Sequence, residues 1–142
     1  MENKKMLRLI EGGVVQDERG TVSFVNDFRF EDVKRFYIVR NITKGFIRAW
    51  HGHRKAGKYL YVVSGSALIG VVNLDTGEIR KYTLKASDPK ILYIPPGFAN
   101  GFQSLTEDAQ VMVFSTDTLE ESGSDSIRFP YDHWNMWSIF PE

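Results

Sequence analysis

Two of the chain's three histidines, His51 and His53, stand one residue apart in the stretch RAWHGHRKAGKYLYVV. Alternate residues of a β-strand point to the same side, so both imidazole rings can face one cavity. Imidazole binds divalent metals and moves protons near neutral pH. Arg48 and Lys58 lie close by with aromatic residues between them, a mixture that suits an anionic substrate. From the residues alone, a metal site, a proton-transfer site and ordinary packed or exposed histidines all remain open.

The ligand count does not favour a metal. A stable site normally takes a third and a fourth protein ligand, but the residues that follow the pair are mostly cations, including Arg54 and Lys55. The only other histidine is His133, and the chain has no cysteine. We therefore predict a site without metal or another cofactor.

Composition excludes several classes of partner. The chain has 142 residues, with 18 basic and 18 acidic side chains, so the formal net charge is zero. This balance argues against nucleic acid or an anionic membrane as a partner. No apolar run is long enough to span a bilayer, and the N-terminus lacks the apolar core of a signal peptide. We expect a cytoplasmic protein.

The local pattern is that of a β protein. Short β-type runs are separated by turn residues, and sustained helical periodicity is missing; only 118–121 and 132–136 could form a helical turn. Asp75-Thr76-Gly77 predicts a hairpin. Strands at this spacing predict a sandwich or a small barrel, with one domain over residues 1–142. The expected strands cover residues 7–10, 21–25, 34–40, 46–51, 58–63, 66–74, 78–84, 90–94 and 111–116.

Strand parity raises a difficulty at the histidines. Arg48 and His51 have opposite parity, so both can enter one site only if a bulge separates them or the arginine reaches round the edge. Parity also places Lys58 on the same face as Leu60 and opposite Tyr59.

Four stretches together resemble the cupin-fold nucleotide-sugar enzymes. They are DERGTVSF at 17–24, IRAWHGH at 47–53, GKYLYVVSGSALIGVVNLDTGE at 57–78 and IPPGFANGFQSLTEDAQV at 94–111. The second half resembles the dTDP-4-dehydrorhamnose 3,5-epimerases, whereas the HxH element and the short chain resemble the 3,4-ketoisomerases of dTDP-4-keto-6-deoxyhexoses. The resemblance covers about residues 5–135.

The resemblance implies an all-β double-stranded β-helix (cupin or jelly-roll) barrel, usually a homodimer. It also implies that the protein acts without metal on a nucleotide-diphospho 4-keto-6-deoxysugar in polysaccharide or deoxysugar biosynthesis. His51 falls on the catalytic base of the epimerases, and His53 on the second histidine of the ketoisomerases. Lys58 falls on the lysine beside the developing enolate oxygen. Arg19 and Arg48 fall on arginines that hold the diphosphate or sugar.

This sequence also departs from the epimerase pattern. Asn100 replaces the histidine of the G-F-A-H-G-F turn, and we assign it to substrate binding. Val113 stands where the catalytic tyrosine is expected. Among the remaining phenols, Tyr37 is the best candidate for the proton donor, although a core aromatic is the commoner role of such a residue.

Three alternatives to the epimerase stay open. They are a 3,4-ketoisomerase, a non-catalytic cupin that binds sugar nucleotides, and a metal-dependent cupin enzyme. The C-terminal tryptophans Trp134 and Trp137 could stack a nucleobase, close a lid or form a dimer contact.

Overall fold

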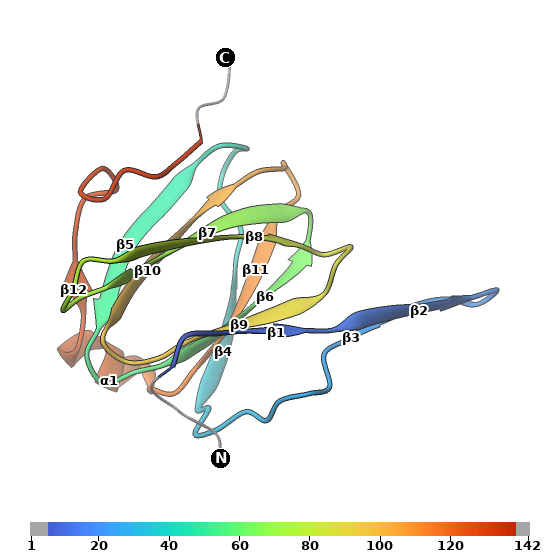
Figure 1. Ribbon diagram of the computed structural model, residues 1–142, viewed down its shortest axis with the longest axis horizontal. Helices are drawn as coiled ribbons and strands as arrows, with labels where there is room; N and C mark the ends of the chain where they lie inside the picture. The colour runs from blue at the N-terminus through green and yellow to red at the C-terminus, as the bar shows by residue number, and fades with distance from the viewer. Residues whose placement is uncertain (1–5, 139–142) are drawn as a thin grey trace.

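The computed structural model describes residues 6–138 and consists almost entirely of β-strands (Figure 1). Two five-stranded antiparallel sheets face each other and enclose the core, and a two-stranded hairpin projects from them. The first sheet has the order β1-β9-β6-β11-β4, and the second has the order β12-β5-β10-β7-β8. This arrangement confirms the predicted cupin-like barrel.

The elements follow one another along the chain as eleven longer strands, a short helix and a final two-residue strand, with the β2–β3 hairpin formed early. Their bounds are β1 Arg8–Glu11, β2 Gly13–Asp17, β3 Gly20–Phe24, β4 Arg35–Val39, β5 Ile47–His53, β6 Lys58–Ser64, β7 Ser66–Asn73, β8 Ile79–Lys85, β9 Lys90–Ile94, β10 Phe98–Ser104, β11 Gln110–Ser115, α1 Leu119–Ser124 and β12 Ile127–Arg128.

Nine of these strands were expected within a few residues of their ends, whereas β2, β10 and β12 were not. The helical turn expected at 118–121 is confirmed as the start of α1, which Thr118 caps in a capping box with Glu121. The turn expected at 132–136 is wrong, since no helix forms there. The predicted hairpin at Asp75-Thr76-Gly77 is confirmed, and Gly77 has a φ of 77°.

The core fills the space between the two sheets. Leu60 and Val62 of β6 and Val111 of β11 pack against Ile69 and Val71 of β7, and all are nearly inaccessible to solvent. Alternation along the strands explains this packing, because every second side chain of each inner strand points between the sheets.

The outer face of each sheet has a different cover. Over the first sheet, Phe28 and Phe30 pack on Tyr59. On the second sheet, the C-terminal segment folds over Trp50, whose ring lies 5.6 Å from Trp134 and 5.0 Å from Trp137. Trp50 is completely buried. The two tail tryptophans thus cover the outside of the barrel.

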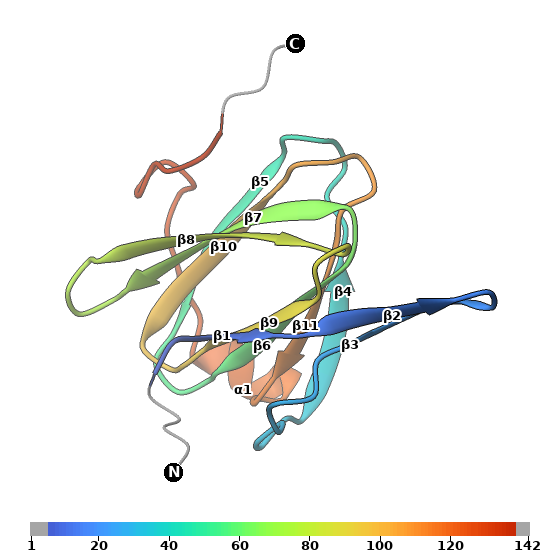
Figure 2. The same cartoon turned by 45° about the vertical axis from the view of Figure 1, so that its right-hand side comes forward.

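The hairpin β2–β3 extends away from the body as an arm, as two views show (Figures 1 and 2). Its valines are exposed: Val14 is 44%, Val15 57% and Val22 64% accessible. No helix in residues 6–138 is both long and apolar enough to cross a membrane.

Candidate active site

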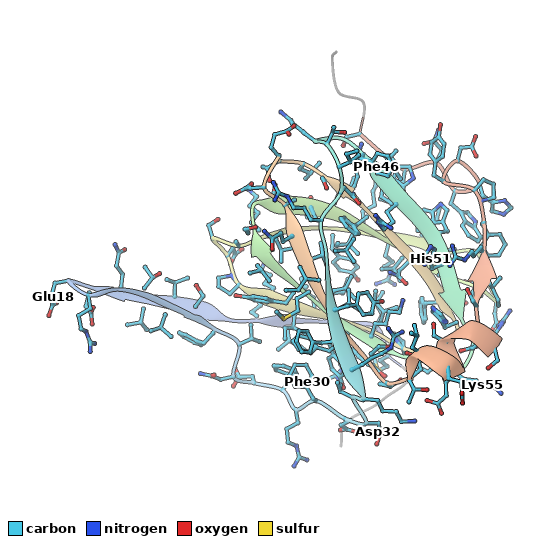
Figure 3. The ribbon with its side chains drawn as sticks, turned by 180° about the vertical axis from the view of Figure 1, so that it is seen from behind. Glu18, Phe30, Asp32, Phe46, His51 and Lys55 are labelled. Atoms are coloured by element: carbon cyan, nitrogen blue, oxygen red, sulfur yellow. The ribbon has the colours of Figure 1, made fainter. Side chains whose placement is uncertain are left out.

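A cavity of about 140 Å³ lies between the two sheets, and most of the predicted site residues line it. Its walls include His51 and Arg48 from β5, Lys58 from β6, Tyr37 from β4 and Asn100 from β10. Four strands from both sheets therefore bring together five residues that the sequence spreads over more than sixty positions. Figure 3 shows His51 on β5, between the end marked by Phe46 and the end marked by Lys55.

A bulge in β5 resolves the parity difficulty. His51 pairs with Asn100 of β10, but Arg48 pairs with Phe102, so the register shifts between these two pairs. The extra residue on β5 turns Arg48 to the cavity side, as the parity argument required. The guanidinium Nε of Arg48 donates to Oδ1 of Asn41 at 3.1 Å, which fixes the arginine at the rim.

His51 lies between two polar neighbours on the inner face of the second sheet. Asn100 is opposite it on β10, and Arg128 is opposite it on β12. Directly paired residues in antiparallel strands point to the same face. Burial, followed by the charges of Arg128 and Lys58, lowers the pKa of His51 to about 4. The imidazole is therefore neutral at pH 7 and can accept a proton.

Lys58 is a buried cation in the facing wall. Only 6% of it is accessible, and burial lowers its pKa to about 8, although Asp117 partly opposes this effect. The amine consequently keeps most of its charge at pH 7 but has lost most of its water. A desolvated cation is effective at stabilising negative charge that develops in a reaction.

Tyr37 is the phenol that reaches the cavity. It pairs directly with Val113 of β11, so both side chains line the same wall. Burial raises the pKa of Tyr37, and the guanidinium of Arg35 lies 5.0 Å from its ring. Tyr59 and Tyr93 pack together on the outer side of the first sheet instead, at a ring distance of 4.7 Å.

His53 is buried beside the cavity, with 5% of its surface accessible. Its Nδ1 lies 3.8 Å from Oδ2 of Asp125. Burial and the charge of Lys58 lower the pKa of His53, while Asp117 and Asp125 raise it. The two histidines are therefore close to one another but differ in their surroundings, since only His53 has carboxylates beside it.

Arg19 does not reach this cavity. It follows Glu18, which Figure 3 labels at the tip of the β2–β3 arm, and pairs with Asp17 at 2.6 Å. Within one chain, the structure separates Arg19 from the other six predicted residues.

Sequence reasoning missed four charged residues of the site. Asp117 forms an ion pair with Arg35 at 3.2 Å, and Arg128 and Asp125 follow the short helix. Arg35 shares strand parity with Tyr37, a signal that was available in the sequence. The other three lie in or after irregular segments, where no periodicity predicts direction. Among residues 6–138, no group of three or more histidine, aspartate or glutamate side chains is arranged to hold a metal ion.

Known proteins share this architecture. The chain is 28% identical over 103 residues to the spore coat polysaccharide biosynthesis protein SpsL of Bacillus subtilis, covering 64% of this chain and 68% of SpsL. The dTDP-4-dehydrorhamnose 3,5-epimerase of Sulfolobus tokodaii is 29% identical, with a TM-score of 0.80 over 97% of this chain and 85% of that one. Some relatives are longer, and the chain spans 66% of one epimerase and 19% of an oxalate decarboxylase.

A sugar 3,4-ketoisomerase is also similar. QdtA of Thermoanaerobacterium thermosaccharolyticum, solved in complex with TDP, is 26% identical, with a TM-score of 0.71 over 89% of this chain and 90% of that one. The model of the dTDP-4-dehydrorhamnose 3,5-epimerase family matches residues 5–136, nearly the full length. The chain therefore belongs to the dTDP-4-dehydrorhamnose 3,5-epimerase family.

Proposed function

We propose that the protein is an epimerase of a nucleotide-diphospho 4-keto-6-deoxysugar that works through an enolate and without a cofactor. The observation that carries this proposal is the pairing of a neutral His51 with a buried, charged Lys58 across one small cavity. A base and a cation in this arrangement suit proton removal next to a ketone.

The chemistry follows from these two groups. A ketone at C4 acidifies the neighbouring C–H bonds; His51 removes the proton, and the electron pair moves to the ketone oxygen. Lys58 stabilises the resulting oxyanion, an effect worth about 3 kcal/mol per donor in comparable sites. Tyr37 lies on the opposite wall from His51 and returns a proton to the other face of the carbon, which inverts it.

The substrate is oriented by its charged end. The cavity of about 140 Å³ is smaller than pockets that enclose whole ligands of drug size, about 300–1,000 Å³. The sugar ring therefore occupies the cavity while the diphosphate remains at the rim near Arg48. Asn100 offers an amide to a sugar hydroxyl beside His51. The TDP complex of QdtA supports a nucleotide sugar as the ligand class.

The second candidate function is 3,4-ketone migration on the same class of substrate. Two observations favour it: the buried His53 provides a second proton carrier on the same strand, and Val113 cannot donate a proton. Moving the ketone needs a proton delivered to C4 from the side on which the first was removed. His51 and His53 meet that requirement.

Incubation of the 4-keto sugar nucleotide with the protein in D₂O separates the two reactions. Deuterium at C5, read by NMR, supports the epimerase, whereas a 3-ketone with a new 4-hydroxyl supports the ketoisomerase. Nucleotide binding with neither a 3-ketone product nor deuterium at any carbon would refute both and leave a sugar-nucleotide-binding protein.

We also infer that two copies of the chain associate through the outer face of the first sheet. Phe36 and Ile38 are 62% and 47% accessible there, although both are large and apolar. The exposed valines of the arm add a second apolar surface that a neighbour could cover. In such a dimer the arm reaches the second copy, and this is the route by which Arg19 can contact substrate.

A further inference from the structure

Arg48 uses one side of its guanidinium on the protein itself. Its Nε donates to Oδ1 of Asn41 at 3.1 Å, and within residues 6–138 neither of its Nη atoms has a hydrogen-bond partner. The same side chain lines the cavity that holds His51. A guanidinium carries five N–H donors in one plane, so a bond at Nε leaves the four N–H groups of the two Nη atoms. Arg48 therefore presents this outer edge to a ligand at the rim.

Asn41 is itself a buried polar residue, with only 5% of its surface accessible. It follows β4 by two residues, and Tyr37 and Val39 of that strand line the same cavity as Arg48. Nδ2 of Asn41 donates to the backbone carbonyl of Phe46 at 3.0 Å, so both ends of the carboxamide are used. The oxygen cannot turn away from the arginine unless the bond at the nitrogen also breaks.

The loop between β4 and β5, which contains Asn41, is anchored to the end of β10. The carbonyl of Phe46 also accepts the backbone amide of Ser104 at 3.2 Å, and the amide of Gly45 donates to the carbonyl of Ser104 at 2.7 Å. Figure 3 labels Phe46 at this end of β5. The bond from Asn41 to Phe46 therefore refers its side chain to the barrel itself and not to a loose segment.

The backbone of Arg48 is set separately, by a close approach of β10. The bulge in β5 lies between the pair that contains His51 and the pair that contains Arg48, and Gly101 is opposite it. A Cβ at position 101 would lie 2.9 Å from the carbonyl oxygen of Arg48 and closer still to Ala49, so glycine is required there. The bulge turns Arg48 toward the cavity, but it does not fix the torsions of a long side chain. Asn41 supplies that second constraint.

We propose that Asn41 is a positioning residue that holds Arg48 ready for a phosphate group of the sugar nucleotide. For its ligand this rests on the proposed function, in which the diphosphate lies at the rim near Arg48. Phosphate oxygens accept two parallel N–H bonds from one edge of a guanidinium. A mobile arginine loses side-chain entropy when a ligand immobilises it, whereas the bond to Asn41 moves part of that loss to folding. Asn41 thus increases affinity without contacting the ligand.

A double-mutant cycle on the full-length protein tests this proposal, with TDP as the probe and titration calorimetry as the measurement. We expect Arg48→Ala to weaken TDP binding at least about tenfold. Asn41→Ala should weaken it about 3–10-fold, the effect of leaving one long side chain mobile. In the Arg48→Ala background, Asn41→Ala should change the dissociation constant by less than about twofold, because it acts through the arginine. The stoichiometry reports the binding-competent fraction, so partial unfolding does not imitate the result.

Glu107→Ala is the matched control for the loop. Oε1 of Glu107 accepts the backbone amide of Lys44 at 3.1 Å, so it holds the same loop without a bond to Arg48. We expect this variant to bind TDP within about twofold of the wild type. The proposal is overturned if Glu107→Ala and Asn41→Ala weaken binding equally, since the loop then explains the loss. It is also overturned if the loss from Asn41→Ala persists without Arg48, since a direct contact then explains it.

Kinetics separates this inference from the proposed function. With the 4-keto sugar nucleotide, Asn41→Ala should raise KM about 3–10-fold and leave kcat within about twofold, because Arg48 acts on the phosphate end and not on the reacting carbon. Conversion by the wild type, with KM and TDP affinity unchanged in Asn41→Ala, would overturn the positioning role and leave the proposed function standing. TDP binding with the expected coupling but no conversion would refute the proposed reaction alone. A wild type that does not bind TDP would refute the positioning role.

Discussion

Replacing Lys58 by methionine is expected to stabilise the protein while removing its activity. Burial moves the pKa of this amine from 10.5 to about 8, a difference of about 2.5 units. At about 1.4 kcal/mol per unit, the folded state loses about 3 kcal/mol by holding a charged amine there at pH 7. Methionine fills a similar volume without a charge, so Lys58→Met should raise the free energy of unfolding by about 2–3 kcal/mol. The melting temperature should rise by about 6–9 °C.

The pH dependence distinguishes this explanation from improved packing. The pKa of Lys58 is lower in the folded state than in the unfolded chain, so between pH 8 and 10.5 the folded state binds fewer protons. As pH rises through this window, the free energy of unfolding of the wild type therefore approaches that of Lys58→Met, and the difference between them disappears near pH 10.5. Urea unfolding at pH 7 and at pH 10 measures the gap, with Lys81→Met on the exposed part of β8 as the control. A variant that is less stable at pH 7, or a gap that does not change with pH, would refute the reasoning.

Three further predictions concern the site, the tail and the association of copies. As pH falls, kcat/KM should decrease near pH 4, where His51 gains a proton, and as pH rises, it should decrease near pH 8, where Lys58 loses one. An acid limb near pH 6.5 would contradict the buried environment of His51. Gly70→Ala places a methyl group 2.6 Å from both Met136 and Trp50, which is too close for either to stay in position. We expect the free energy of unfolding in urea to fall by about 1–3 kcal/mol and tryptophan fluorescence to shift to the red as the tail lifts. An unshifted spectrum would show that the tail stays in place. In size-exclusion chromatography with light scattering, the wild type should elute as a dimer and the double variant Phe36→Glu with Ile38→Glu as a monomer. A monomeric wild type would refute the association.

The sequence predicted the barrel because its strands alternate regularly. Lys58, Leu60 and Val62 point inward, and Tyr59 points outward, as their parity requires. Parity also identified the conflict between Arg48 and His51, and the bulge in β5 supplied the answer. Where the backbone is regular, the direction of a side chain follows from its position in the strand.

The charged surroundings of His53 could not be predicted in the same way. Asp117 and Asp125 lie on either side of a short helix, and their positions depend on how that segment packs against the turn after β5. The fate of Arg19 depends on the arm, which has no contact with the cavity in one chain. Irregular segments and contacts between copies are set by tertiary and quaternary packing, which local pattern does not encode.

The proposed reaction depends most directly on His51 as the group that takes the proton. The decisive measurement is the rate at which deuterium at the carbon next to the ketone is lost to water, compared between the wild type and His51→Asn at equal occupancy by the sugar nucleotide. We expect ready loss with the wild type and a rate about 10²–10⁴-fold lower with the variant, while both bind the nucleoside diphosphate equally. Equal rates of loss would contradict it.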